Sequence, residues 1–322
     1  MTEIMTEMPQ FDSVDSVQAW ALASLLGRGT SVSPRGASTL ELHPVSFALL
    51  NPRKRCITNL ARRWSLPLAI GEFCWHVSAS DDAAFIEYYS SSWRNFADGS
   101  RIRGSCYGRR IFGTTDGKCS QWQQLVRLLT TDPQSRRAVL NVMGAEGTLS
   151  AEAVDIPCTC TIQFLLRSGH LDAVIYMRSN DAIWGLPYDI FLFSMLQEML
   201  AVELGVQLGS YFHTVASLHL YERHLRLAQE VVSNPSLNGF EMPVMPELQN
   251  LPVFLSIEKA LRTGGEVTDG DTVGIPEYWR ELIGVLVEYA RVRANRTYNI
   301  PVPRRYEPFL RMMQTKKTAA HV

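Results

Sequence analysis

Helices are predicted wherever apolar residues recur at intervals of three and four positions along the chain. The longest apolar pattern of this kind covers residues 187–206, and it is expected to form a buried central helix. A shorter helix near the start of the chain is expected to end at Gly29, because glycine commonly stops helices. The other helical patterns cover residues 66–77, 120–130, 222–232 and 277–294.

Strands are predicted in the middle of the chain, in runs rich in β-branched and aromatic residues. Ser168-Gly169 separates two of these runs and predicts a hairpin turn. A further run at 211–221 is expected to be one strand that leads into the helix at 222–232. The three central runs cover residues 137–143, 160–167 and 170–177.

Two other regions are rich in turn residues. Short strands are expected within 31–70, beside an arginine-bearing turn at Pro34-Arg35-Gly36. Residues 233–275 are punctuated by Pro and Gly and include a polar loop. There are no repeats and no low-complexity linker, so the elements predict one α+β domain with a mixed sheet packed against helices.

Composition and charge narrow the class of protein. Of the 322 residues, 46% are hydrophobic and 20% are charged, which is enough to build a full globular core. The formal charge of −1 argues against a general binder of nucleic acid or membrane surfaces. No apolar run approaches the roughly 18 residues that span a bilayer. We therefore expect no membrane and no stable nucleic-acid partner, and any bound anion must be held by a few arginines.

Six cysteines are too sparse for a disulfide scaffold in a chain of this length. The polar, acidic start does not resemble an export signal. We therefore expect a cytoplasmic protein with reduced thiols. Cys158-x-Cys160 could share one face of a strand, but no second cysteine pair or histidine pair completes a zinc site, so no metal is expected.

Cys158 is the candidate nucleophile. It follows Pro157 at the entry to a predicted strand, although a lone intracellular cysteine is more often a small buried hydrophobe. A reactive thiolate needs positive charge nearby, and the chain has arginines within about twenty residues on either side, including Arg178. The planar guanidinium group of arginine also binds phosphate well. The combination favours a catalytic site that binds a phosphorylated substrate.

Four ordered motifs carry a resemblance to the thymidylate synthase family across roughly residues 30–310. They are an arginine turn, a Pro-Cys-x-x-x-x-Gln-Phe strand, a polar loop before an apolar helix, and a His-x-Tyr pair. In this chain they read Ser135-Arg136-Arg137, Pro157-Cys158 with Gln163-Phe164, Arg178-Ser179-Asn180-Asp181 through Gly185, Pro187, Tyr188, Asp189 and Ile190, and His219-Leu220-Tyr221. This resemblance implies a thymidylate synthase-like fold in which a sheet face forms a dimer interface. It divides the chain into an extension (1–30), a catalytic domain (31–310) and a tail (311–322).

The resemblance also implies a role for each matching residue. Cys158 would add to C6 of a pyrimidine nucleotide, Glu72 would order water and move protons, and Tyr107 would line the cleft beside the nucleophile. The one-carbon donor would be 5,10-methylenetetrahydrofolate, contacted by Trp93, Asp181, Trp184 and Gly185. The nucleotide would be held by Arg35, Arg178, Ser179, His219 and Tyr221, with Arg136 and Arg137 reaching in from the second subunit of a homodimer.

Three positions depart from the usual family pattern. Thr159 follows the nucleophile where histidine is usual, and Met177 precedes Arg178 where glutamine is usual. Asp189 stands where uracil-specific members have asparagine. An amide matches the N3–H donor and O4 acceptor of uracil, whereas a carboxyl group accepts from the amino group of cytosine and shares a proton with N3. Asp189 therefore predicts a cytosine base, unless its role is only to cap the following helix.

Aspartate at this position resembles the cytidylate and deoxycytidylate hydroxymethylases of the family, including those of nucleoside-antibiotic pathways such as mildiomycin biosynthesis. The predicted activity is folate-dependent C5 hydroxymethylation of cytidine 5′-monophosphate (CMP). A deoxycytidylate (dCMP) substrate, C5 methylation instead of hydroxymethylation, and a non-catalytic nucleotide- or RNA-binding relic of the fold remain alternatives. The choice between ribose and deoxyribose depends on space beside Ser217, His219 and Tyr221, and the sequence leaves it open.

Overall fold

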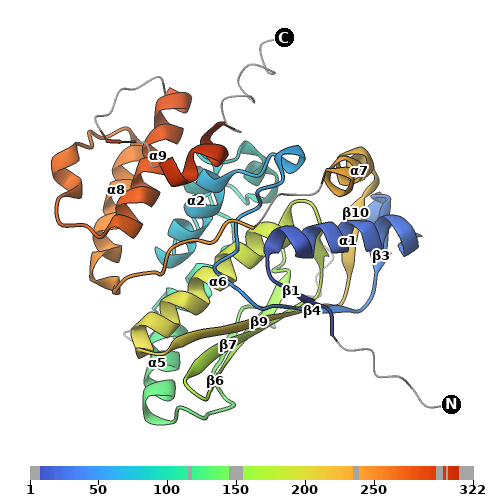
Figure 1. Cartoon of the computed structure of the whole chain (residues 1–322), viewed down its shortest axis with the longest axis horizontal. Helices are drawn as coiled ribbons and strands as arrows, with labels where there is room; N and C mark the ends of the chain where they lie inside the picture. Colours follow the sequence, from blue (N-terminus) through green and yellow to red (C-terminus); the bar gives the residue numbers. More distant parts are fainter. Residues whose placement is uncertain are drawn as a thin grey trace.

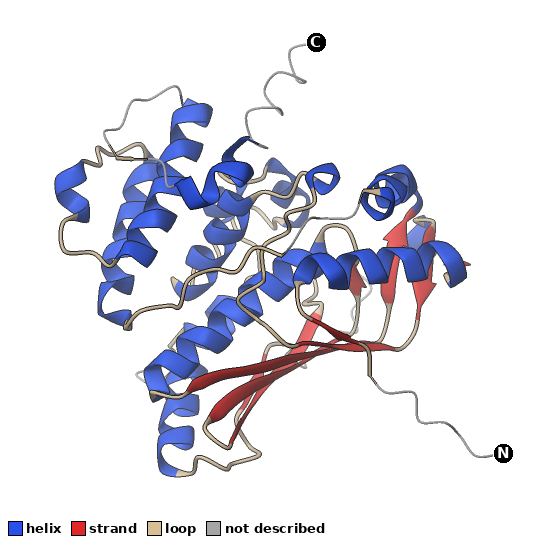
Figure 2. Ribbon diagram, viewed as in Figure 1, coloured by secondary structure: helices blue, strands red, loops and turns tan. Residues whose placement is uncertain are grey.

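A computed structural model describes residues 8–114, 118–144, 155–234, 239–294, 300–301 and 304–311. The start of the predicted extension and nearly all of the predicted tail lie outside these ranges. Figures 1 and 2 show helices gathered on one side of a large sheet, with a smaller sheet beside it. The described residues therefore confirm the predicted α+β class.

The large sheet has six strands in the order β1-β4-β9-β7-β6-β5. Its centre is mixed, because β7 pairs antiparallel with β6 and parallel with β9. The Ser168-Gly169 hairpin between β6 and β7 is confirmed. The strands are β1 (Gln10–Phe11), β4 (Val45–Leu49), β5 (Val139–Asn141), β6 (Thr159–Arg167), β7 (His170–Met177) and β9 (Gln207–Val215).

The small sheet has the order β2-β3-β10-β8, with β2 (Thr30–Val32), β3 (Thr39–Leu42), β8 (Asn180–Asp181) and β10 (Leu218–Tyr221). The single strand predicted at 211–221 is therefore wrong, because β9 and β10 lie in different sheets. Ala216 N–H donates to the carbonyl of Met177, and the next carbonyl, of Ser217, accepts from Asn180 N–H. The backbone partners thus change from β7 to β8 at this point, and the two sheets meet there.

The predicted helices are all present. Three further helices of the described residues were not predicted: the short α3 and α4, and α8, which lies in the Pro- and Gly-rich region. Pro252 occupies the first turn of α8, where a missing N–H costs nothing, and Gly264 ends it at φ +83°. The described helices are α1 (Val14–Arg28), α2 (Leu66–Val77), α3 (Ala83–Glu87), α4 (Tyr107–Phe112), α5 (Gln121–Thr131), α6 (Gly185–Leu204), α7 (Leu225–Ser233), α8 (Leu251–Thr263) and α9 (Glu277–Ala294).

Helix α6 is the buried centre that the sequence predicted, and Figure 1 shows it between α2 and the large sheet. It carries polar residues into the core, where the Glu198 carboxylate accepts a 2.5 Å hydrogen bond from the buried Arg55 guanidinium. Its first turns project toward the junction of the two sheets, because β8 leads directly into it. A rigid, fully packed helix therefore fixes the position of any site residue near its start.

The described part of the predicted N-terminal extension belongs to the same core. Val14, Val17, Leu22 and Leu25 of α1 are fully buried, and β1 pairs with β4. Among the described residues, none of the helices has both the length and the apolar character needed to cross a bilayer.

The face of the large sheet that points away from the helices carries large side chains. Val174 and Phe212 are register partners on this face, and both are half-buried. The Tyr176 side chain, two residues along β7, is 44% exposed.

Candidate active site

Arg178 fixes the loop that carries Cys158. Its backbone N–H donates to the Cys158 carbonyl at 2.9 Å. Its guanidinium donates to the carbonyls of Pro157 at 2.9 Å and Ile156 at 3.0 Å. One guanidinium nitrogen also lies 3.8 Å from the Cys158 sulfur. The same side chain therefore holds the backbone of the loop and places positive charge beside the thiol.

The Cys158 thiol sits at the entry to β6 and is half-buried. Burial raises its pKa to about 11, the Arg178 guanidinium opposes this rise, and Asp189 and Asp155 add to it. The resting group is therefore a thiol at neutral pH. It must lose its proton when it attacks, and Arg178 stabilises the thiolate that results.

Asp155 ties the Cys158 loop to the opposite wall of the site. Its carboxylate accepts from the backbone N–H groups of Gly104 and Ser105 at 2.7 and 2.9 Å, and from the Ser105 hydroxyl at 2.6 Å. These residues lead into α4, which begins at Tyr107. No role was predicted for Asp155, because its partners are about fifty residues away along the chain.

Tyr107 lies on that wall, buried and stacked on His76 with ring centroids 5.3 Å apart and planes 8° apart. Burial raises the pKa of its phenol, and the charges of Asp189 and Cys158 act in the same direction. Three predicted catalytic residues from α4, α6 and the start of β6 thus interact electrostatically. The fold brings them to one place.

Asp189 is the fifth residue of α6. The N-cap of this helix is Trp184, which makes no side-chain capping bond. The alternative in which Asp189 merely caps the helix is therefore wrong. Its carboxyl group interacts electrostatically with Glu72, Tyr107 and Cys158 instead.

Asn180 holds the Asp189 carboxyl group. Its amide nitrogen donates to Asp189 Oδ2 at 2.6 Å, and its side chain is almost completely buried, at 2% exposure. Burial raises the pKa of Asp189 to about 7, the Asn180 hydrogen bond opposes the rise, and Asp181 adds to it. Gly185 leaves room for the pair, since a Cβ there would lie 3.3 Å from Asp189 Oδ2. Because Oδ2 already accepts from Asn180, the proton of the neutral acid is expected on Oδ1.

This protonation state predicts a pH dependence of nucleotide binding. For the cytosine base that the sequence predicts, a neutral Asp189 would donate a proton to N3 below about pH 7, and above it the carboxylate would repel the N3 lone pair. In a Cys158→Ala protein, which removes the thiol titration, the affinity for CMP is expected to fall as the pH rises through about 7. Calorimetric titration from pH 6 to 8.5 measures this. The double variant Cys158→Ala/Asp189→Asn is expected to lose the fall, and a fall of the same size in it would refute the assignment.

Glu72 projects from α2 and is buried. Burial raises the pKa of its carboxyl group well above the usual value, Asp189 adds to the rise, and a hydrogen bond with Trp93 opposes it. Trp93 also contacts Trp75, with ring centroids 5.5 Å apart. Two neighbouring carboxyl groups, Glu72 and Asp189, are therefore both shifted toward their protonated forms, which suits proton transfer at neutral pH.

The small sheet contributes the predicted nucleotide-binding residues. The Ser179 hydroxyl lies 3.4 Å from His219 Nδ1, and the His219 and Tyr221 rings meet edge to face at 5.1 Å. The pKa of Tyr221 is raised mainly by burial, and the charges of Asp181, Cys158 and Arg35 also act on it. Arg35 is exposed in its turn, with a left-handed backbone at φ +52°. This side of the small sheet therefore faces the Cys158 site.

Arg136 and Arg137 do not join this cluster within one chain. Both are exposed just before β5, the edge strand of the large sheet. Val139 is the register partner of Gln163, five residues along the strand from Cys158. At about 3.3 Å per residue this separation is roughly 17 Å, and the two arginines lie further along. Within the chain they are too far away to share a phosphate with Arg178.

Comparison with known proteins identifies the family of this chain. The family model described as thymidylate synthase matches residues 37–253. The chain belongs to the thymidylate synthase family. A deoxyuridylate hydroxymethyltransferase of Bacillus phage SP01 is 27% identical over 244 residues, which cover 71% of this chain and 64% of the phage protein. The chain thus matches somewhat less than two thirds of that relative's length. The thymidylate synthase family consists of one-carbon transferases that use 5,10-methylenetetrahydrofolate.

Trp184, one of the predicted folate residues of this thymidylate synthase family member, has a partly open aromatic face. The Trp184 indole is 44% exposed, donates to His224 Nε2 at 3.1 Å, and has the Arg62 guanidinium 4.8 Å above its ring. Arg62 Nη1 is buried without a hydrogen-bond partner among the described residues. Asp181 accepts from the backbone N–H groups of Ile183 and Trp184 and so shapes the turn. The other guanidinium nitrogens of Arg62, Nε and Nη2, donate to the Ile183 carbonyl at 3.0 and 2.6 Å, so Arg62 mainly holds this turn against the aromatic face. The exposed indole face fits a flat aromatic ligand.

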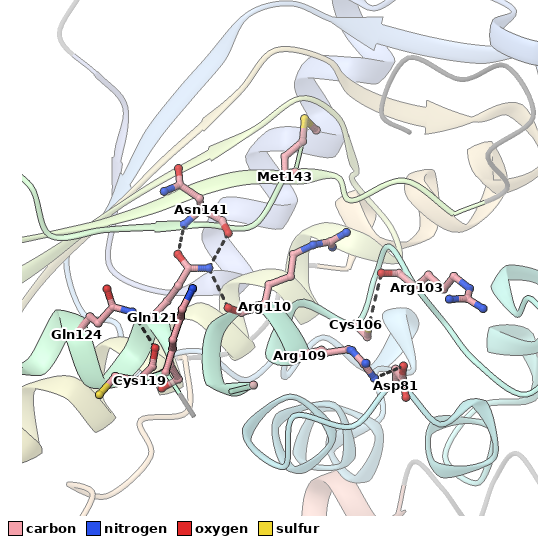
Figure 3. Close-up of a pocket in the computed structure, with 14 residues that line it drawn as sticks. Asp81, Arg103, Cys106, Arg109, Arg110, Cys119, Gln121, Gln124, Asn141 and Met143 are labelled. Atoms are coloured by element: carbon pink, nitrogen blue, oxygen red, sulfur yellow. Dashed lines mark hydrogen bonds and ion pairs between the residues drawn. The ribbon is translucent and has the colours of Figure 1, made fainter. Parts of the chain in front are cut away.

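A separate pocket lies between α4, α5 and the end of β5 (Figure 3). Gln121 bridges its walls, donating to the carbonyls of Arg110 and Asn141 and accepting from Asn141 N–H. Arg109 is paired with Asp81 at its rim. None of the predicted site residues lines this pocket. Across the described ranges, no three His, Cys, Asp or Glu side chains gather as a metal site.

Proposed function

We propose that this thymidylate synthase family member hydroxymethylates C5 of CMP, with 5,10-methylenetetrahydrofolate as one-carbon donor. The observation that carries the proposal is the buried Asp189–Asn180 pair, which interacts electrostatically with the Cys158 thiol. A neutral Asp189 presents a proton to N3 and an acceptor oxygen to the amino group of cytosine. The name of the phage relative supports hydroxymethyl transfer as the reaction type.

In the proposed reaction, Cys158, Asp189 and Glu72 each have a separate role. The Cys158 sulfur bonds to C6 as its proton passes to solvent, and Asp189 passes a proton to N3, so the electron pair of the C5–C6 double bond becomes nucleophilic at C5 and bonds to the one-carbon unit. The folate supplies this unit at the oxidation level of formaldehyde.

Loss of the C5 proton lets the bond between the new carbon and the folate nitrogen break, and the nitrogen takes up a proton. A water held by Glu72 then adds to the carbon and gives up a proton. The electron pair re-forms the C5–C6 double bond as the Cys158–C6 bond breaks, and N3 returns its proton to Asp189. The net change replaces C5–H by C5–CH₂OH.

Two features support a deoxyuridylate substrate as the second candidate. The phage relative is named for deoxyuridylate. A neutral carboxyl group also carries one donor and one acceptor, as an amide does, and so also matches N3–H and O4 of uracil. C5 methylation and a non-catalytic binding role are the further alternatives to a hydroxymethylase. Direct product analysis separates all of these.

The proposed function is tested by mass analysis of products from CMP, dCMP, UMP and dUMP, each incubated with methylenetetrahydrofolate. The proposal expects CMP to be the best substrate and its product to be heavier by one CH₂O unit, because C5–H becomes C5–CH₂OH. A product heavier by one CH₂ unit would indicate a methyltransferase instead. Absence of product from all four nucleotides, together with retained nucleotide binding, would indicate the binding protein.

We further propose a homodimer in which Arg136 and Arg137 complete the partner's phosphate site. Their exposure and their distance from Cys158 in one chain support this arrangement. The sheet face that carries Val174, Tyr176 and Phe212 is the proposed interface. In this proposal residues 31–310 form the catalytic domain, and the free cysteines and near-neutral charge fit a cytoplasmic enzyme that acts on small molecules.

A further inference from the structure

Glu41 lies on the face of the small sheet that carries the predicted sugar-binding residues. In the antiparallel pairing of β3 with β10, Glu41 is the register partner of His219, and Thr39 is the partner of Tyr221. Side chains alternate between the two faces of a strand, so all four share one face. Leu218 and Leu220 of β10 point the other way and are fully buried.

This face points toward the reacting centre. Burial raises the pKa of Tyr221, and the charges of Asp181, Cys158 and Arg35 also act on it, so the Tyr221 side chain lies near all three. His219 contacts Ser179, the residue next to Arg178. Glu41 is half-buried at this position, so its carboxylate is partly shielded from solvent.

Ser217 holds the Glu41 carboxylate. Its hydroxyl makes a short hydrogen bond to Glu41 Oε1, although the two residues are 176 positions apart along the chain. Ser217 lies where the chain passes from β9 to β10, and its carbonyl accepts from Asn180 N–H. Within the described residues, no hydrogen bond engages the second oxygen of Glu41. A carboxylate anchored through one oxygen keeps acceptor capacity on the other.

We propose that Glu41, anchored by Ser217, recognises the sugar of the nucleotide by accepting hydrogen bonds from its 2′- and 3′-hydroxyl groups. The inference rests on the proposed function only in requiring a pyrimidine nucleoside monophosphate as substrate. A vicinal diol offers two O–H donors, which match a carboxylate that accepts without donating. A deoxyribose lacks one donor and leaves a partly buried carboxylate oxygen without a partner, which costs binding. The pair therefore selects ribonucleotides over deoxyribonucleotides.

The alternative to sugar recognition is a purely structural role, in which Glu41 and Ser217 only connect two segments of the small sheet. In that case their loss would affect ribonucleotides and deoxyribonucleotides alike. The ratio of kcat/KM for CMP to that for dCMP separates the two roles, because a structural effect cancels from it. The same ratio is measured for UMP and dUMP, so the conclusion about Glu41 does not depend on which base the enzyme prefers.

The experiment compares wild-type protein with Glu41→Ala, Glu41→Gln and Ser217→Ala. Wild type is expected to favour the ribonucleotide, and Glu41→Ala is expected to lower the ribo/deoxy ratio by roughly 10- to 100-fold, the range for a hydrogen bond to a charged group. Glu41→Gln and Ser217→Ala are expected to lower it less. Glu266→Gln makes the same chemical change at an exposed loop position and is the control.

Two results would overturn the proposal: a wild-type preference for deoxyribonucleotides, or an unchanged ribo/deoxy ratio in Glu41→Ala, as an equal loss on both sugars would give. Ser217→Ala removes only a hydroxyl and keeps the inference testable if Glu41→Ala does not fold. Failure of the proposed function would give a different result. The cytosine/uracil preference or the product mass would then differ from the expected one, while the ribo/deoxy ratio could still depend on Glu41.

Discussion

Replacing Cys158 by alanine is expected to lower kcat by at least about 10⁴-fold with every pyrimidine nucleotide, because no other group can form the bond to C6. Nucleotide affinity is expected to stay near its wild-type value, since Arg178 keeps its hydrogen bonds to the carbonyls of Ile156 and Pro157. Release of tritium from C5 of labelled nucleotide measures the chemistry, and calorimetry measures binding.

Cys160 provides a matched control for this variant. It lies two residues further along the chain, in β6, and is also half-buried. Arg178 also acts on the Cys160 thiol, but its guanidinium holds the loop of Cys158, through the carbonyls of Ile156 and Pro157. Cys160→Ala is expected to retain most of the activity. Tritium release by Cys158→Ala at a rate close to that of wild type would exclude Cys158 as the nucleophile.

The second large effect is expected at Asp189. Changing Asp189 to asparagine replaces an acid that passes a proton to N3 of cytosine by an amide, which hydrogen-bonds but has no proton to transfer, whereas uracil already carries a proton on N3. Losing this general acid corresponds to a change on the order of 10² to 10⁴ in the ratio of kcat/KM for CMP to that for UMP. Steady-state kinetics on the four nucleotides measures the change.

Asp172→Asn is the control for this exchange, because Asp172 accepts a hydrogen bond from Ser210 N–H on the large sheet and has no contact with the site residues described above. It is expected to leave base preference unchanged. If Asp189→Asn also kept its preference for cytosine, the assignment of the base to this carboxyl group would be refuted. The result is independent of whether the product carries a methyl or a hydroxymethyl group.

Much of the fold could be predicted from the sequence, because its signals are local. The hairpin at Ser168-Gly169 and the capping box that starts α5 at Ser120 with Gln123 each depend on residues only a few positions apart. The apolar pattern of α6 is equally local. The passage from β9 to β10 was missed, because the switch at Ala216 depends on backbone partners in β7 and β8 that no local pattern shows.

The site was predicted as a set of residues but not as a set of contacts. Motif spacing identified Cys158, Arg178 and Asp189, yet the Asn180–Asp189 hydrogen bond and the raised pKa of Asp189 follow from burial at the start of α6. Glu41 carried no signal at all, since its partner Ser217 is reached only when β3 pairs with β10. Such contacts come from topology, which spacing along the chain does not encode.

A solved complex of the protein with CMP tests the central claim most directly. The Cys158 sulfur is expected within about 3–3.5 Å of C6 of the pyrimidine, or bonded to it, as a near-attack geometry requires. An Asp189 oxygen is expected within about 2.6–3.2 Å of N3 or of the amino nitrogen. A base bound with Asp189 out of hydrogen-bonding range, or with the sulfur far from C6, would contradict it.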